Sequence, residues 1–193
     1  MTVLILGLLI FLGAHSVRVF GEPWRARTIQ SIGPNAWKGA YSVASIVGFV
    51  LIVYGFGLAR HAPTRVWVPP IWTRHLAALL VLPALILLVA AYVPGNQIKG
   101  RLHHPMVLGV KTWALSHLIA NQMLHELILF GAFLVWAVLS YRAARARDRA
   151  AGTVYAPGSV GMTVVTLVVG TAAWAAFAFW LHGPLFGVKP FGG

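Results

Sequence analysis

The sequence contains no cysteine, and only three of its 193 residues are acidic. Without cysteine the chain cannot form disulfides, thiolate-ligated haem, Fe–S clusters or cysteine-zinc sites. Any metal must therefore be held by histidine or a carboxylate, and eight histidines are available. Charge is scarce as well, because 9% of the residues are charged, against about 25% in an ordinary soluble domain. The composition argues against a soluble globular enzyme.

Long apolar runs make up most of the chain instead. Hydrophobic residues account for 59% of it, and the mean hydropathy is +0.81. Continuous runs separated by short basic segments are typical of an all-α, multi-pass membrane protein. The formal net charge of +12 comes from residues between the runs, where they set topology and contact anionic headgroups. The expected partners are therefore membrane lipids, and nucleic acid is not expected.

The runs predict a bundle of six transmembrane helices. Their approximate ranges are 2–20, 37–58, 73–93, 105–121, 123–141 and 160–181. As one helix, residues 105–141 would be ~55 Å long and exceed a bilayer, so a hairpin near 121–125 is favoured over one kinked helix. Eleven of the 15 Lys and Arg residues then lie on one side. The positive-inside rule then gives an N-out, C-out orientation.

The segments between these helices define the predicted domain organisation. Residues 21–36 are expected to form a polar loop, because Pro23, Gly33 and Pro34 are helix breakers, and residues 94–104 form another loop. Residues 1–141 then make a membrane domain of five spans. Residues 142–159 form a basic cytoplasmic loop, whose first half could continue the preceding helix. Residues 160–193 hold the sixth span and a short tail.

Three histidines and a lysine fall within HHPMVLGVKTWALSH, residues 103–117. Polar groups in hydrocarbon are costly and usually serve function. His117 is deepest, ~18 Å from Pro105 by helical rise, and His15 lies in the last turns of the first span. Two inward imidazoles on separate helices suit a bis-histidine haem b site. His104 is nearer to His15 in depth and is the alternative partner, and a purely structural hydrogen bond is the other interpretation of each histidine.

Cationic and outer residues add weaker candidates. Lys111 can reach the inner interface or pair with a haem propionate or anionic substrate, as can Arg18 on the first span. A metal site on the outer side would draw on four histidines and one glutamate, but none of them shows a close paired spacing. These are His61, His75, His125, His182 and Glu126. Hydrolase, zinc-protease and nucleotide-binding motifs are absent, and no catalytic residue is assigned.

A family resemblance adds to this interpretation. The runs GLLIFLGAHSVRVF, IGPNAWKGAYSVASIVGFVLIVYGFGLAR and LHHPMVLGVKTWALSHLIAN, in this order, resemble the NnrU family of bacterial membrane proteins over about residues 4–141. The resemblance implies an inner-membrane protein associated with denitrification, with nitrite or nitric oxide reductase machinery as partners. That family is similar to the plant 15-cis-ζ-carotene isomerase Z-ISO, a haem b membrane enzyme in which the iron's redox state changes its axial ligation.

The resemblance also bears on individual residues. By motif it implies His15 and His117 as axial ligands of haem b, with His104 and His75 as further candidates. Ala114 stands where the isomerase helix has a cysteine, so a thiolate ligand is not available here.

Two other functions remain open. The chain could be a non-catalytic accessory or assembly factor for a nitric oxide reductase, with structural histidines. HHPMVLG is also distantly similar to the RHPxYxG motif of membrane methyltransferases that use S-adenosylmethionine. His103 and Val107 replace the Arg and Tyr of that motif. The sequence therefore leaves open whether the protein is an enzyme, and whether its chemistry is redox or cis–trans isomerisation.

Overall fold

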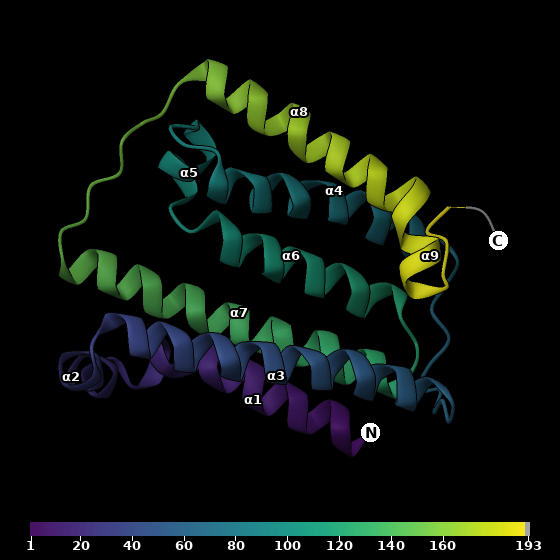
Figure 1. The fold of residues 1–193 in the computed structure, drawn as a ribbon. Coiled ribbons are helices and arrows are strands. Elements are labelled where there is room, and N and C mark those ends of the chain that lie inside the picture. The colour runs from purple at the N-terminus through teal and green to yellow at the C-terminus, as the bar shows by residue number, and fades with distance from the viewer. Residues whose placement is uncertain (192–193) are drawn as a thin grey trace. The chain divides into compact units, whose positions relative to one another are not determined.

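The computed structural model describes residues 1–191 of the chain. Within them every regular element is a helix, and the only β-type pairings are two isolated bridges. The predicted all-α fold is therefore confirmed (Figure 1). The elements are α1 Thr2–Phe20, α2 Glu22–Ile32, α3 Pro34–Arg60, α4 Trp72–Tyr92, α5 Gln97–Leu102, α6 Pro105–Ala120, α7 Leu124–Ala150, α8 Val160–Ala176, the π-helical turn η1 Phe177–Leu181 and α9 His182–Phe186.

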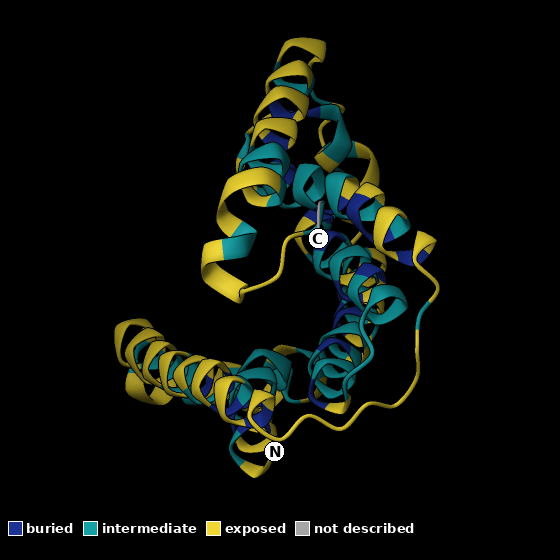
Figure 2. Ribbon diagram, turned by 90° about the vertical axis from the view of Figure 1, so that its right-hand side faces the viewer, coloured by how far each residue is buried: buried dark blue, intermediate teal, exposed yellow. Residues whose placement is uncertain are grey.

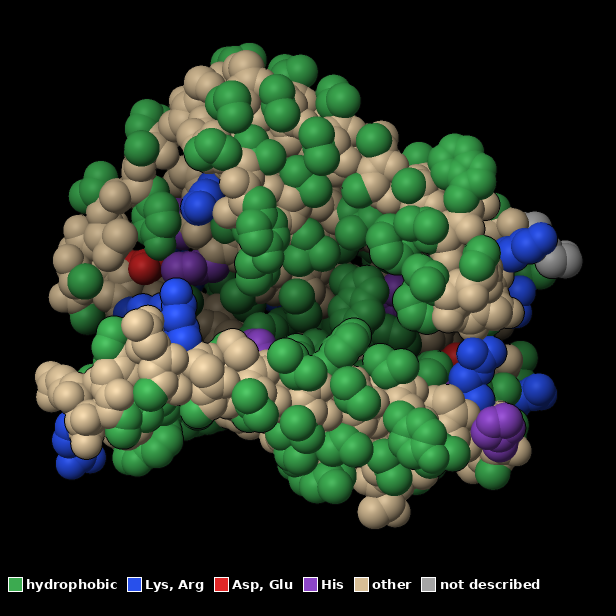
Figure 3. All heavy atoms as spheres, in the orientation of Figure 1, with side chains coloured by type: hydrophobic (Ala, Val, Ile, Leu, Met, Phe, Trp, Pro, Cys, Tyr) green, Lys and Arg blue, Asp and Glu red, His purple; other side chains and the backbone are tan. Residues whose placement is uncertain are grey.

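Among residues 1–191, five helical segments are long and apolar enough to cross a membrane. They are α1, α3, α4, α7 and the continuous stretch Val160–Phe186. Their outward faces carry large apolar side chains, such as Leu9, Val43 and Val168, each more than 60% exposed. Figure 2 shows exposed residues running along these helices, and Figure 3 shows apolar side chains over much of the visible face. Such faces require an apolar surrounding, so the chain has the surface of a membrane protein.

The number of spans differs from the predicted six. The predicted span at 105–121 forms α6, but that helix has 16 residues and is only ~24 Å long. A helix needs about 20 apolar residues to cross the ~30 Å hydrocarbon layer. The helix stops because Asn121 is extended, with φ −95° and ψ 152°. The break between the fourth and fifth runs is confirmed, whereas the N-out, C-out orientation stays a prediction.

Two further loop predictions were wrong. Residues 22–32 of the expected polar loop form α2, because Pro23 lies in the first turn, where its missing N–H costs nothing. Gly33, with φ +84°, ends that helix in a conformation that favours glycine. Residues 97–102 of the second predicted loop form α5. By contrast, the basic stretch after residue 141 continues α7 as far as Ala150.

The described chain divides into two compact units. The first unit comprises Met1–Trp67 and Gln122–Ser140. The second comprises Val68–Asn121 and the chain from Tyr141 onward. Helix α7 therefore contributes its first part to one unit and its last part to the other.

Glycines bring α1 and α3 into backbone contact in the first unit. A Cβ on Gly55 would lie 2.3 Å from the Leu4 nitrogen, and one on Gly48 would lie 2.6 Å from the Phe11 nitrogen. Only glycine permits so close an approach, as in small-residue packing between membrane helices.

A small apolar core closes around this helix pair. Leu4, Leu8 and Ile52 are at most 6% exposed. The first part of α7 covers them with its apolar face, which presents Ile128, Leu129, Ala132 and Phe133. The first unit is therefore a three-helix assembly of α1, α3 and the beginning of α7.

Helix α4 is the centre of the second unit, with α6 on one side and α8 on another (Figure 1). Gly109 of α6 packs on the Ala84 carbonyl, and Gly170 of α8 packs on Ile86. The Trp174 indole N–H donates to the Ala78 carbonyl at 3.0 Å. Glycines therefore allow close helix packing in the second unit as they do in the first, and the Trp174 hydrogen bond also links α8 to α4.

A buried asparagine shapes the turn from α4 into α5. Asn96 is 1% exposed, and its amide donates to the Ala90 and Val93 carbonyls at 2.9 and 2.6 Å. Its Oδ1 accepts from the Lys99 N–H at 2.8 Å. One side chain therefore satisfies the end of one helix and caps the start of the next.

Candidate functional site

His15 of α1 is the best-defined candidate in the first unit. Its Nδ1–H donates to the Phe11 carbonyl one turn earlier, at 2.7 Å. Its ring also stacks on the Phe11 ring, with 4.2 Å between centroids. A hydrogen on Nδ1 leaves the Nε2 lone pair available in the neutral ring. Donation to a carbonyl from the other nitrogen is the usual way of orienting a metal-ligating histidine.

Aromatic residues from the other two helices surround this imidazole. Tyr41 of α3 lies 5.2 Å from His15 between ring centroids, and Trp136 of α7 lies 6.1 Å away, edge to face. The Trp136 Nε1–H is buried without a hydrogen-bond partner in the described structure, as is the Ser140 hydroxyl one turn further along α7. Buried donors are normally satisfied, so these two are donors available to acceptor atoms of a ligand at this position.

His117 has the same local arrangement in the second unit. Its Nδ1–H donates to the Trp113 carbonyl at 2.9 Å, and its ring lies 5.3 Å from the Trp113 ring. The Ser116 hydroxyl donates to the same carbonyl at 2.7 Å. His15 and His117 belong to different units, and their pairing as axial ligands stays a sequence-based prediction.

His104 lies in a polar cluster of the second unit. Asp148 Oδ2 is 2.8 Å from His104 Nε2, and it accepts from the Tyr155 hydroxyl at 3.1 Å. Arg145 Nη1 contacts both Asp148 and His103 Nδ1, and the His103 ring stacks on Tyr155. The cluster joins the α5–α6 connection to the end of α7 and the segment that follows. In this arrangement the Nε2 of His104 is engaged by a carboxylate.

The backbone at His103 is strained. Its φ is +70° and its ψ is −52°, and the His104 N–H donates to the Leu102 carbonyl at 2.9 Å. This is a γ-turn of the rare positive-φ kind, a conformation that persists only where the surroundings enforce it. The turn directs two consecutive histidines into the cluster, and Pro105 then begins α6 as predicted.

The remaining predicted residues differ in exposure and in partners. Lys111 and His75 are exposed on α6 and α4. The Arg18 guanidinium is 3.9 Å from Glu22. His125, a member of the outer set, is buried against Phe56. Within residues 1–191, no three histidine or carboxylate side chains converge as a metal site.

Several site residues were missed by sequence reasoning. Trp136 and Ser140 belong to an apolar run and carry no motif, so nothing in the sequence connects them to His15. Asp148 had one usable signal, because it is the single acidic residue within a basic stretch. Its contact with His104 spans 44 residues of chain and depends on tertiary packing.

A comparison with known protein families identifies the chain. It matches the family described as NnrU protein over residues 3–190. The chain belongs to the NnrU family. The family match spans both units, including α8 and the residues that follow it as far as 190. It also confirms the resemblance inferred from the motifs around His15 and His117. No curated protein and no solved structure matches this NnrU chain.

Proposed function

We propose that this NnrU-family chain is an integral membrane protein that binds haem b and takes part in denitrification. The observation that carries the proposal is the His15 site, in which an oriented imidazole lies beside a buried indole N–H without a partner. Family membership supports the connection with nitrite and nitric oxide metabolism. The five apolar helical segments suit residence in the bacterial cytoplasmic membrane.

The donor chemistry at His15 fits a haem ligand. A neutral histidine nitrogen is an established axial ligand of haem iron, and the Phe11 carbonyl fixes the tautomer that presents Nε2. Phe11, Tyr41 and Trp136 supply an aromatic surrounding. A bound haem would supply one-electron chemistry or binding of a diatomic gas. The chain itself orients the imidazole through the Phe11 carbonyl.

His117 is the second proposed ligand. Its Nδ1–H is held by the Trp113 carbonyl in the same way as that of His15 is held by Phe11. In the same proposal, the Trp136 indole N–H and the Ser140 hydroxyl donate to acceptor atoms of the bound group. Redox chemistry, nitric oxide handling and isomerisation all begin from this ligation.

The visible spectrum of the full-length protein tests the proposal. Protein purified from haem-replete cells is expected to show a sharp low-spin Soret band. That band should be lost or shifted to high spin in His15→Ala and in His117→Ala. His61→Ala is the matched control, because His61 is an exposed histidine in the first unit and its removal should leave the spectrum unchanged. A colourless wild-type protein would overturn haem binding and favour an accessory role.

The link to denitrification needs a separate measurement. A deletion strain grown anaerobically on nitrate is expected to accumulate nitrite or nitric oxide. Wild-type protein should restore the normal rates, and the folded His15→Ala variant should fail to do so. If the variant complements as well as the wild type, the role in denitrification does not require His15, and the proposed connection between them is overturned.

A further inference from the structure

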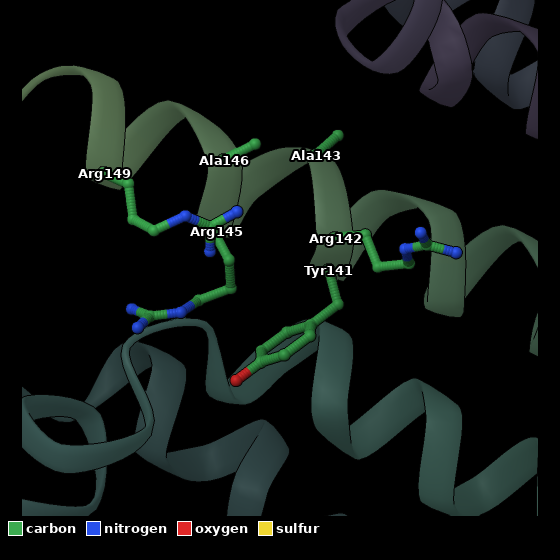
Figure 4. A pocket seen from close by; sticks show the side chains of 6 residues that line it. All are labelled: Tyr141, Arg142, Ala143, Arg145, Ala146 and Arg149. Carbon is green, nitrogen blue, oxygen red and sulfur yellow. The ribbon is translucent and has the colours of Figure 1, made fainter.

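A hollow of about 570 Å³ lies on the last turns of α7, in the second unit. Its lining consists of three arginines, one tyrosine and two alanines (Figure 4): Tyr141, Arg142, Ala143, Arg145, Ala146 and Arg149. The small alanines leave space between the longer side chains. In Figure 4 the Arg145 and Arg149 guanidinium groups lie near each other, while Arg142 points the other way along the helix. The hollow therefore offers the Arg145 and Arg149 guanidinium groups as neighbouring donors.

The charges around the hollow are not balanced by the chain itself. The sequence has three acidic residues in all. Glu22 pairs with Arg25 at 2.9 Å, and Glu126 accepts from two backbone N–H groups at the start of α7. Asp148 is the acidic residue near the hollow, and it already accepts from Tyr155 and contacts His104 and Arg145.

Excess positive charge therefore remains at the hollow. No carboxylate pairs with Arg142 or Arg149 within residues 1–191. Both side chains are exposed and available to an anion from outside the chain. Guanidinium groups bind phosphate with paired, charge-assisted hydrogen bonds.

The position of the hollow on α7 suits a lipid phosphate. Residues 127–139 of this helix are uniformly apolar, and the basic stretch begins directly after Tyr141. A tyrosine at this point is typical of the membrane interface. From Arg142 to Arg149 the helix rises about 10 Å, whereas the headgroup layer on each side of a bilayer is about 5–7 Å thick. The arginines therefore cover the depth at which phospholipid phosphates lie.

The polar cluster holds one of these arginines in place. Arg145 is fixed by His103 and Asp148, and the strained turn at His103 keeps that histidine in position. A side chain already ordered in the free protein loses less entropy when a ligand binds. The ordering of Arg145 therefore distinguishes this hollow from a row of mobile surface cations.

From this geometry we propose that the hollow binds the phosphate of an acidic membrane phospholipid. Arg149 supplies the unneutralised charge beside the phosphate, and Arg145 supplies the ordered guanidinium. Tyr141 and the two alanines provide the wall and floor. The site is independent of haem, and it uses none of the residues assigned to it.

Lipid binding to the full-length protein in nanodiscs tests this site. The probe is phosphatidylglycerol, titrated into phosphatidylcholine discs and detected by native mass spectrometry. Saturable binding is expected, and Arg149→Gln should weaken it about tenfold or more, as for loss of a charge-assisted hydrogen bond. Arg149→Lys keeps the charge and should recover part of the affinity. Unchanged helix content by circular dichroism shows that each variant is folded.

Arg147→Gln is the matched control, because it removes the same charge from the same helix at a residue that does not line the hollow. General attraction to an anionic surface predicts at most about a fivefold loss there. Equal losses in Arg147→Gln and Arg149→Gln would overturn the site in favour of diffuse electrostatics. A second arm adds inorganic phosphate to discs of phosphatidylcholine alone. Binding of phosphate without binding of phosphatidylglycerol would overturn the lipid as occupant, and absence of both would overturn the site.

Discussion

Replacing Gly55 with alanine tests the backbone contact between α1 and α3. The added Cβ would lie 2.3 Å from the Leu4 nitrogen, 2.7 Å from the Leu4 Cα and 2.8 Å from the Val3 carbonyl carbon. Favourable carbon contacts lie at about 3.5–4.0 Å, so the two helices must separate by about 1 Å. All three atoms belong to backbone, and no side chain can rotate away to relieve the contact.

The expected loss follows from two opposing terms. Overpacking of this kind costs roughly 1–3 kcal/mol, whereas alanine in a helix interior is favoured over glycine by about 0.8–1.0 kcal/mol. Gly57→Ala isolates the second term, because a Cβ there meets nothing within 4 Å. The two variants should therefore differ by about 1–3 kcal/mol, equivalent to roughly 2–12 °C in Tm for a chain of this size.

Thermal unfolding in detergent, followed by far-ultraviolet circular dichroism, measures this difference. Gly55→Ala should unfold below the wild type or close to it, and Gly57→Ala at or above it. If both variants unfold at the same temperature, the close approach of α1 to α3 is not present in the protein. A larger loss for Gly57→Ala than for Gly55→Ala would place the packed face on the opposite side of α3.

Other predictions concern individual polar groups. Trp136→Phe removes a buried indole N–H that lacks a partner. It should leave the stability of the apo-protein unchanged or raised, and it should weaken haem retention in dialysis. Unchanged haem retention would remove Trp136 from the site. Asn96→Ala strips three hydrogen bonds from a buried turn and should cost about 1–3 kcal/mol of unfolding free energy, whereas Ala at exposed Asn35 should change it little. Burial, together with the hydrogen bond to Asp148 and its negative charge, raises the pKa of Tyr155 above the usual 10.0. The neutral phenol therefore contributes its stabilisation of the fold at pH values below 10. This contribution is lost as the pH rises through the higher pKa of the folded state. The difference in tyrosinate absorbance between the wild type and Tyr155→Phe should show that Tyr155 ionises above pH 10. Asp148→Asn should move the midpoint of this ionisation to lower pH.

The sequence predicted most helices because hydrophobic runs determine where a membrane helix can form. The first span was predicted at residues 2–20, and α1 occupies Thr2–Phe20, because Gly21 follows the predominantly apolar run. Helix α2 was missed because Pro23 was interpreted as a breaker, although proline in a first helical turn favours the helix. The count of six failed at α6, where hydropathy identified the helix but overestimated its reach.

The candidate site was only half predictable. His15 and His117 stood out because imidazole is rare in apolar spans. The groups that orient and surround these imidazoles come from the backbone and from helices distant in the sequence. The Phe11 carbonyl carries no sequence signal, and Trp136 reaches His15 through packing of α7 on α1. Hydropathy identifies which residues are apolar, but it does not say which faces of two helices meet.

The division of the first unit between two stretches of chain has a consequence for biosynthesis. Helices α1 and α3 emerge early, but residues 122–140, which complete their unit, follow only after Val68–Asn121. At about 5–20 residues per second, those roughly fifty intervening residues take about 3–10 s to synthesise. During that interval the helix pair must persist in the membrane with its core face uncovered, held by its glycine contacts. The ribosome therefore makes about half of the second unit before the first can be completed.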